Sequence, residues 1–222
     1  MWSNYAEAWK GARVGRSFVN SILVCLVTLA VLTVITSMAS YILTRVTKSR
    51  LLSVYFSLGI MIPVHALLIP SVLIFKGLHL IDHLSGLMIV YTAVNISFAM
   101  FIMNGFMEGI PRELDEAATI DGCGRAGIFF HIVFPVAKPG IASVATITFL
   151  NCWNDLLLGL VLISTPARKT LSMTISALKG SYVTQYGLLC AGFVISIVPV
   201  VFMYLLFQKQ VIAGMTAGAV KG

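Results

Sequence analysis

The sequence predicts an all-α membrane protein with five membrane-spanning helices. Hydrophobic residues make up 59% of the 222 residues and charged residues only 10%, whereas soluble domains carry about a quarter charged residues. Several apolar runs also reach the roughly 20 residues that a helix needs to cross the hydrocarbon core of a bilayer. The expected spans are residues 17–44, 51–75, 84–107, 140–164 and 187–207.

The composition argues against nucleic-acid binding and against an enzyme of a familiar class. The net charge of +7 is spread along the chain without basic clusters that alternate with aromatic residues. No G-K-[ST] phosphate loop, H-E-x-x-H or G-x-S-x-G motif occurs, so we expect no catalytic residue, metal site or cofactor in this chain. Four cysteines lie without metal-ligand spacing and are expected to be structural: Cys25, Cys123, Cys152 and Cys190.

The first 16 residues mix aromatic and basic side chains, a composition typical of a helix that lies at the membrane interface. The aromatic residues are Trp2, Tyr5 and Trp9, and the basic ones are Lys10, Arg13 and Arg16. The following uncharged run, 17–44, is about 28 residues long, which suits one tilted transmembrane helix rather than a secretory signal. Arg45, Lys48 and Arg50 then form a short basic loop.

The second span contains two prolines, Pro63 and Pro70, which stand seven residues apart and are expected to kink one helix in the same direction. His65 lies between them. Two interpretations stay open for it: a functional intramembrane histidine, or one that bonds a backbone carbonyl freed by a proline.

The fourth span carries polar residues inside an apolar run. Thr148, Asn151 and Asp155 fall at positions i, i+3 and i+7, so they would share one face of a helix. Lipid would leave these groups unpaired, so the face must meet other helices or a water-filled path. With Asn154, these residues are the candidate translocation path.

A polar island, 111–135, separates the third and fourth spans. Pro111 suits the first position of a helix, and Glu113, Asp115 and Glu116 suit the positive end of its dipole. Gly122 is expected to end this helix in the left-handed conformation. A second short helix should begin near Ile128, run through Ile132 and stop at Pro135. The apolar side of the first helix needs a protein groove: Leu114, Ala117, Ala118 and Ile120.

The spacing within this island resembles the EAA loop of ABC importer permeases, E-A-A-x3-G-x9-I-x-L-P. Glu116-Ala117-Ala118, Gly122, Ile132 and Pro135 match it, and Phe134 replaces the leucine. In that family the loop is cytoplasmic and docks into the ATPase subunit as a coupling helix. The resemblance implies this role for the loop 108–139 and for seven residues: Glu116, Ala117, Ala118, Asp121, Gly122, Ile132 and Pro135.

Matches to the carbohydrate-uptake, maltose-permease-like branch of that family cover nearly the whole chain. They include Tyr5, Asn20-Ser21, the turn 41–45, Pro63, Pro70 and Trp153-Asn154-Asp155. The resemblance implies a type I ABC importer transmembrane domain in the bacterial inner membrane, surrounded by lipid, that transports a sugar or oligosaccharide. It also implies a second permease subunit, an ATPase dimer that holds ATP and magnesium, and an external solute-binding protein.

The same resemblance predicts six spans, one more than the sequence supplies. A cytoplasmic EAA-like loop would place residues 1–16 outside the membrane, although they are basic, and residues 208–222 inside as a tail. We therefore expect a further helix upstream of Met1, with residues 17–207 forming the permease domain.

Two functions of other classes compete with this reading. An ion-coupled secondary transporter would use Asp155 and His65 to carry protons or sodium. A purely structural membrane subunit would have no conduction path, and the polar face of the fourth span argues against it.

Overall fold

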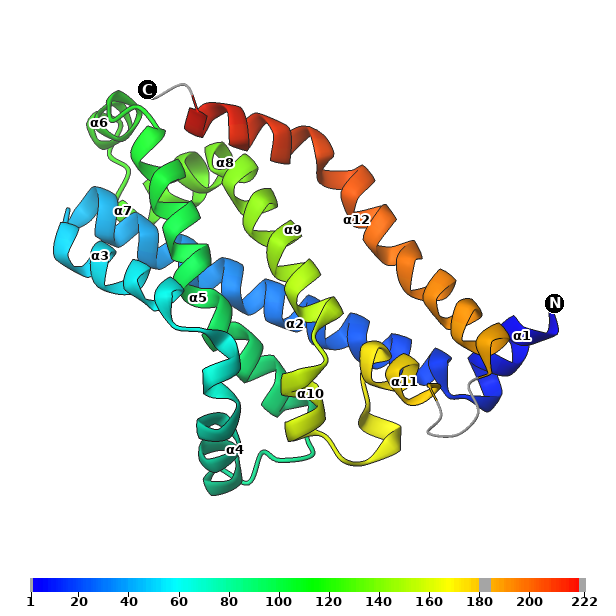
Figure 1. Cartoon of the computed structure of the whole chain (residues 1–222). Coiled ribbons are helices and arrows are strands. Elements are labelled where there is room, and N and C mark those ends of the chain that lie inside the picture. Colours follow the sequence, from blue (N-terminus) through cyan, green and yellow to red (C-terminus); the bar gives the residue numbers. More distant parts are fainter. Residues whose placement is uncertain (1, 180–184, 220–222) are drawn as a thin grey trace. The chain divides into compact units, whose positions relative to one another are not determined.

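The computed structural model describes residues 2–179 and 185–219, which form helices joined by short turns without any strand (Figure 1). The α-helices are α1 Ser3–Ala6, α2 Val14–Tyr41, α3 Arg50–Leu58, α4 Leu68–Gly77, α5 Leu84–Gly109, α6 Glu113–Ile120, α7 Arg125–Ile128, α8 Phe134–Val136, α9 Lys138–Asn154, α10 Leu157–Leu162, α11 Leu171–Ala177 and α12 Tyr186–Ala219. Wider π-helical turns occupy Glu7–Gly11, Ile42–Val46 and Phe129–Val133, and tighter 3-10 turns occupy Gly59–Met61, Val64–Leu67 and Pro166–Arg168.

Three helical stretches are long and apolar enough to cross a membrane: Val14–Val46, Leu84–Gly109 and Tyr186–Gln208. They correspond to the first, third and fifth predicted spans. Two bent pairs, Arg50–Met61 with Val64–Gly77 and Arg125–Val136 with Lys138–Asn154, raise the total to five if each pair is one span. The predicted tail begins inside α12, which continues to Ala219, and residues 220–222 lie outside the described residues.

The second predicted span is not one kinked helix, because the helix breaks before Pro63. Proline disfavours a helical conformation at the residue before it, and Ile62 is accordingly extended, with ψ of 117°. Pro70 causes no kink, since it lies in the first turn of α4, where a missing N–H costs little. His65 is exposed in the 3-10 turn Val64–Leu67, directly after this break, and no described residue accepts a hydrogen bond from it.

The fourth predicted span, 140–164, is also interrupted. The helix α9 ends at Asn154, and α10 begins only at Leu157. Asp155 lies at this break, where its carboxylate accepts a hydrogen bond from the hydroxyl of Tyr91 at 2.7 Å and another from the N–H of Gly159 at 3.0 Å. A carboxylate that bonds the first turn of the next helix competes with continuation of the previous one. The prediction that Asp155 continues the polar face of a helix is therefore wrong.

The chain divides into two compact units. Unit 1 comprises Met1–Thr28, Pro63–Thr92 and Phe149–Leu205, and unit 2 comprises Leu29–Ile62, Ala93–Thr148 and Leu206–Gly222.

In unit 1, the first half of α2 holds the segment around α11 by polar side chains. The amide of Asn20 donates to the carbonyls of Ala167 and Lys169 at 3.1 and 3.0 Å, and the hydroxyl of Ser21 accepts the N–H of Leu171 at 2.8 Å. These bonds satisfy backbone groups that otherwise lack partners at the start of α11. The pair Asn20-Ser21, which the family resemblance includes, is thus structural in this fold.

Trp153 joins three further helices of unit 1. Its indole N–H donates to the carbonyl of Ser196 in α12 at 3.1 Å, and its own carbonyl accepts the hydroxyl of Ser172 in α11 at 2.7 Å. Its ring meets that of Phe18 in α2 edge to face at a centroid distance of 5.6 Å. Because Trp153 is 3% exposed, its indole N–H needs this protein partner.

A cluster around Asp82 links the turn before α5 to the turn after α10. The carboxylate accepts the hydroxyl and N–H of Thr165 and the N–H of Ser164, and it pairs with Arg168. The pKa of Asp82 is lowered from 3.8 to about 2, mainly by the hydrogen bond from the hydroxyl of Thr165 and next by the bond from the N–H of Thr165. The ionised form is therefore the one that stabilises this connection.

We expect the Asp82 cluster to make the stability of the protein depend on acid pH. A lowered pKa contributes stability above pH 3.8 that is lost as the pH falls toward about 2. The melting temperature of the parent protein should therefore fall over this range, and Asp82→Asn should start a few degrees lower at neutral pH and lose less on acidification. Asp121→Asn, at an exposed carboxylate, is the control. Equal acid dependence in all three proteins would contradict this role.

The core of unit 2 lies where α2, α5, α7 and α9 meet. Its fully buried members include Leu32, Ala99, Met103, Met107, Val133 and Val144. This core also takes in Ala118 of α6, so it supports the polar island that the sequence singled out.

Candidate functional site

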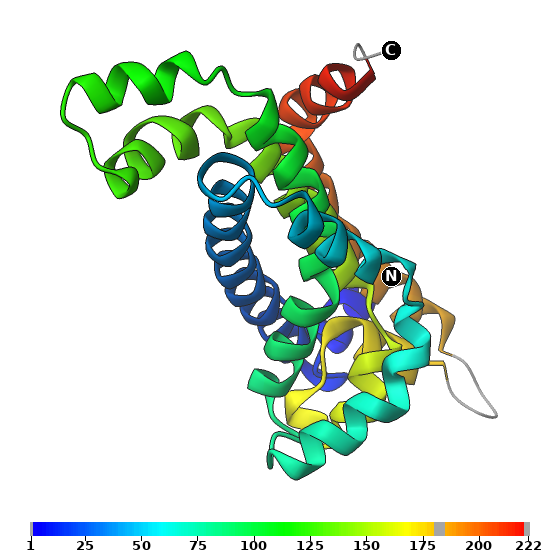
Figure 2. The same ribbon diagram turned by 90° about the vertical axis from the view of Figure 1, so that its left-hand side faces the viewer.

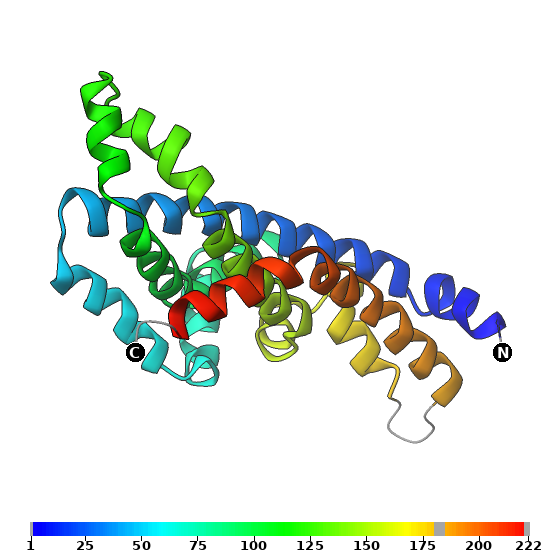
Figure 3. The ribbon, with the colours of Figure 1, turned by 90° about the horizontal axis from the view of Figure 1, so that it is seen from above.

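The polar island forms a helical hairpin in unit 2, with α6 beside the segment 125–136 (Figures 2 and 3). The first arm, α6, begins at Glu113 rather than at Pro111, which precedes the N-terminal cap residue Arg112. The carbonyl of Pro111 faces Arg45 instead, at 3.0 Å. As predicted, acidic residues occupy the first turn of α6, where they favour the helix dipole.

The prediction that Gly122 ends α6 is confirmed. Gly122 has φ of +82°, the left-handed conformation that glycine adopts without steric cost. Its N–H donates to the carbonyl of Thr119 at 3.1 Å, and the N–H of Cys123 donates to that of Ala118 at 2.9 Å. These two bonds form a Schellman motif, which satisfies carbonyls at the end of the helix and reverses the chain.

The second arm starts earlier and ends later than the sequence predicts. It begins at Arg125 in α7, passes through the π-helical turn Phe129–Val133 and ends at Val136 in α8. Pro135 thus lies inside the arm and does not stop it. A wider turn directly before a proline relieves the clash of its ring with the preceding turn and the loss of its N–H.

Arg45, in the π-helical turn that follows α2, fastens the hairpin to the end of α5. Its Nε donates to Asp115 of α6 at 2.7 Å. One Nη atom donates to the carbonyls of Met107 and Ile110, both at 3.0 Å. The other donates to the carbonyl of Ile110 at 3.2 Å and to that of Pro111 at 3.0 Å. All five N–H donors of the guanidinium are therefore used, and its side chain is only 4% exposed.

Tyr41 provides a second attachment, to the other arm of the hairpin. Its hydroxyl donates to the carbonyl of Arg125 at 3.1 Å, and its ring lies 5.3 Å from that of Phe129. Between the arms, Ala118 is 6% exposed and contacts the unit 2 core. Both arms are thus held by residues at the end of α2 and in the turn that follows it, and the outer face of α6 stays uncovered.

The seven residues predicted for coupling separate into two groups. Four are exposed on the hairpin: Glu116, Ala117, Asp121 and Gly122. The other three are buried or half-buried and support the hairpin from inside: Ala118, Ile132 and Pro135. Two apolar side chains of α6 also remain outside, Leu114 at 41% exposure and Ile120 at 86%. The hairpin therefore presents a mixed acidic and apolar surface.

The candidate translocation residues do not form one exposed polar face. Thr148 is 1% exposed, whereas Asn151 and Asn154 on the same helix are exposed. Asp155 lies beyond the end of α9 and bonds Tyr91 and Gly159. No group of three or more His, Cys, Asp or Glu side chains within the described ranges is placed to hold a metal ion.

Sequence reasoning missed the partners of Arg45, Tyr41 and Asp155. Each is a polar group within or directly after an apolar run, which signals that it has a partner without indicating which one. In the sequence, Arg45 is distinguished only as the first charged residue after an uncharged run of about 28 residues.

The structure is that of a helical protein with several helices long and apolar enough to cross a membrane, and its polar island forms a hairpin with an exposed outer face. A family model for the binding-protein-dependent transport system inner membrane component matches residues 32–216. The chain therefore belongs to this family of transport components, which are not enzymes.

Several permeases of named transport systems match along nearly the whole chain. The sulfoquinovosyl glycerol transport system permease of Agrobacterium fabrum is 32% identical, over 99% of this chain and 78% of that protein. A probable permease for starch degradation products from Thermoanaerobacterium thermosulfurigenes is 33% identical, over 100% and 81%. The trehalose transport system permease of Mycobacterium tuberculosis is 32% identical, over 100% and 82%. These comparisons do not support the ion-coupled alternative.

The fold is also that of a solved importer. A chain of a bacterial ABC transporter involved in the import of the acidic polysaccharide alginate superposes with a TM-score of 0.80, over 93% of this chain and 78% of that one. At 22% identity this likeness concerns the fold alone, and it confirms the type I importer architecture.

We expect Arg45→Met to destabilise the protein by about 3–5 kcal/mol, because it leaves a half-buried carboxylate and several carbonyls without the donors of the buried guanidinium. Arg45→Lys should rescue only part of this loss, since an ammonium group has fewer N–H donors than a guanidinium and lacks its planar, forked arrangement of donors. Melting of the purified protein measures both.

Lys48→Met is the matched control, because Lys48 is an exposed cation in the same loop. The double variant Arg45→Met/Asp115→Ala should cost less than the sum of the two single changes, since they share one interaction. Additive effects, or a parental melting temperature in Arg45→Met, would rule out the attachment.

Gly122 and Gly124 offer a matched pair of substitutions. An added Cβ meets nothing within 4 Å at either position, but only Gly122 has positive φ. Gly122→Ala should therefore cost about 1–2 kcal/mol of stability, and Gly124→Ala much less. Gly122→Val should cost more and should impair uptake by moving the hairpin. The turn assigned to Gly122 would be wrong if both positions tolerated alanine equally.

Proposed function

We propose that this chain is a permease subunit of an ATP-driven importer for a sugar or oligosaccharide, and that α6 is its coupling helix. The names of the relatives support the solute class, because they include permeases for trehalose, starch degradation products and a glycoside of glycerol. The proposed transport unit also contains a second permease, an ATPase dimer that binds ATP and magnesium, and an external solute-binding protein.

The observation that carries this proposal is the combination of an exposed outer face on α6 with rigid attachment of its inner face. Glu116 and Ala117 are exposed, and Ile120 is 86% exposed. An apolar side chain with adjacent acidic groups favours a partner groove that is apolar inside and basic at its rim.

The attachment explains how movement would pass into the membrane. Arg45 bonds α6 and the end of α5 through one buried guanidinium, and Tyr41 bonds the second arm. A displacement of α6 by the ATPase would therefore move the ends of α2 and α5 with it rather than bend the loop. Such rigid coupling is what a two-state transporter requires.

The placement in the membrane follows from this role. The hairpin 108–139 and residues 208–222 would be cytoplasmic, and residues 1–16 would lie outside a bacterial inner membrane. Asn151 and Asn154 stay our candidates for the solute path because they are exposed on α9. Thr148 and Asp155, which we also predicted for the path, would support it from within the protein.

We expect Glu116→Lys to abolish solute-stimulated ATP hydrolysis and uptake while leaving membrane insertion intact. Reversing this charge places like charges together at the interface, which costs several kcal/mol. Glu7→Lys, at an exposed carboxylate of the N-terminal segment, is the control. Parental transport by Glu116→Lys would exclude α6 as the coupling helix.

Cysteine labelling tests the orientation directly. Cys123 is an exposed native thiol in the hairpin, so a version that keeps Cys123 alone reports on it without a new residue. A membrane-impermeant maleimide added to intact spheroplasts should not label Cys123 but should label Ser3→Cys in a version without native thiols. Labelling of Cys123 from outside would place the hairpin on the wrong face and overturn the proposal.

A further inference from the structure

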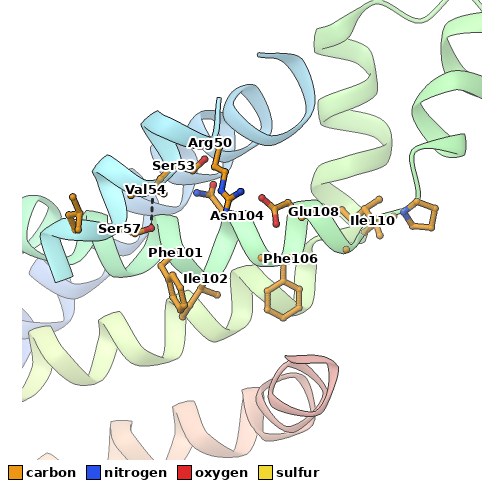
Figure 4. A pocket seen from close by; sticks show the side chains of 15 residues that line it. Arg50, Ser53, Val54, Ser57, Phe101, Ile102, Asn104, Phe106, Glu108 and Ile110 are labelled. Carbon is orange, nitrogen blue, oxygen red and sulfur yellow. Dashed lines mark hydrogen bonds between the residues drawn. The ribbon is translucent and has the colours of Figure 1, made fainter. Parts of the chain in front are cut away.

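A cavity of about 840 Å³ lies in unit 2, where α3 lines one side and the C-terminal half of α5 lines the other (Figure 4). This volume is within the range of small-molecule sites in proteins. The cavity is separate from the outer face of α6, and none of the candidate coupling or translocation residues lines it.

The lining combines an apolar part with a charged part. Val54 and Phe101 lie in the apolar part, and Arg50, Asn104 and Glu108 come together farther along, between these two residues and Ile110, as Figure 4 shows. The charged part lies at the start of α3 and at the end of α5, and thus at one end of the candidate membrane span Leu84–Gly109. The cavity therefore suits an amphiphile, because it offers charged groups near the end of this span and apolar side chains farther along it.

The polar groups at the charged end are not satisfied by the protein. Among the described residues, ion pairs join Arg45 to Asp115 and Arg168 to Asp82, so neither Arg50 nor Glu108 takes part in one. The side chain of Asn104 is 7% exposed, and its carbonyl oxygen is buried without a hydrogen-bond partner. A buried amide without a partner is costly unless a ligand or water completes it.

We infer that this cavity binds a zwitterionic phospholipid whose headgroup carries a primary ammonium, that is, a phosphatidylethanolamine. The guanidinium of Arg50 suits the phosphate, and the carboxylate of Glu108 and the amide of Asn104 suit the ammonium. Val54, Leu58 and Phe101 offer the apolar surface that an acyl chain needs.

The combination of charges favours this lipid over other occupants. An anionic lipid would gain from Arg50 but would be repelled by Glu108. A sugar would leave the apolar end uncovered, and an apolar helix of another subunit would bury Arg50 and Glu108 without partners. The inference rests on the proposed function in one respect only, which is the membrane leaflet that supplies the lipid. This is the cytoplasmic leaflet if the hairpin is cytoplasmic.

Photolabelling of the assembled transporter tests this site. The complex is placed in phosphatidylcholine nanodiscs with a trace of photoactivatable phosphatidylethanolamine or, separately, photoactivatable phosphatidylglycerol. The ethanolamine probe should label peptides of α3 and α5 more strongly. Glu108→Gln should reduce its labelling about tenfold, as expected for one charge-assisted hydrogen bond, and should reverse the preference in favour of the glycerol probe.

Arg50→Gln should reduce labelling by both probes, whereas Lys48→Gln should change neither, because Lys48 is an exposed cation two residues away that does not line the cavity. If both probes labelled the protein equally and no variant changed that labelling, the proposal would be overturned. Crosslinking of Val54→Cys to another subunit would also overturn it, because it would identify a protein as the occupant. Labelling is measured without uptake or ATP hydrolysis, so failure of the coupling role would leave this result intact.

Discussion

The guanidinium of Arg45 is the constraint on which the arrangement of unit 2 depends. The end of α5 exposes carbonyls that have no donor within the helix, and the first turn of α6 brings a carboxylate beside them. In an apolar environment these groups would otherwise remain unpaired at a cost of several kcal/mol. One planar cation with five donors satisfies them together, and it thereby sets the angle at which the chain leaves α5 and enters α6.

Polar side chains bond the free backbone groups at two other helix ends of this protein. Asp155 bonds the first turn of α10 after α9 ends, and Asp82 bonds the backbone that follows α10. A polar side chain at a helix end supplies partners to N–H groups that have no carbonyl within the helix. This accounts for carboxylates that a functional reading of the sequence would assign to ion transport.

The hairpin illustrates how one segment combines stability and recognition. Its inner residues, Ala118 and Ile132, join the unit 2 core, whereas Glu116 and Ile120 remain outside. A small residue at 118 lets α6 approach the core closely, and Gly122 turns the chain in the smallest space. The spacing of the motif thus reflects two requirements, a tight reversal and an outer face free for a partner.

Local patterns in the sequence determined the features that depend on neighbouring residues alone. Length and composition identified the long spans, and the acidic first turn and Gly122 identified α6, because dipole and φ preferences act within a few residues. The break at Asp155, the π-helical turn before Pro135 and the partners of Arg45 were decided by the tertiary structure. Arg45 and Asp115 lie 70 positions apart, and only packing decides which distant carbonyls a buried cation meets, since many pairings would satisfy the same local pattern.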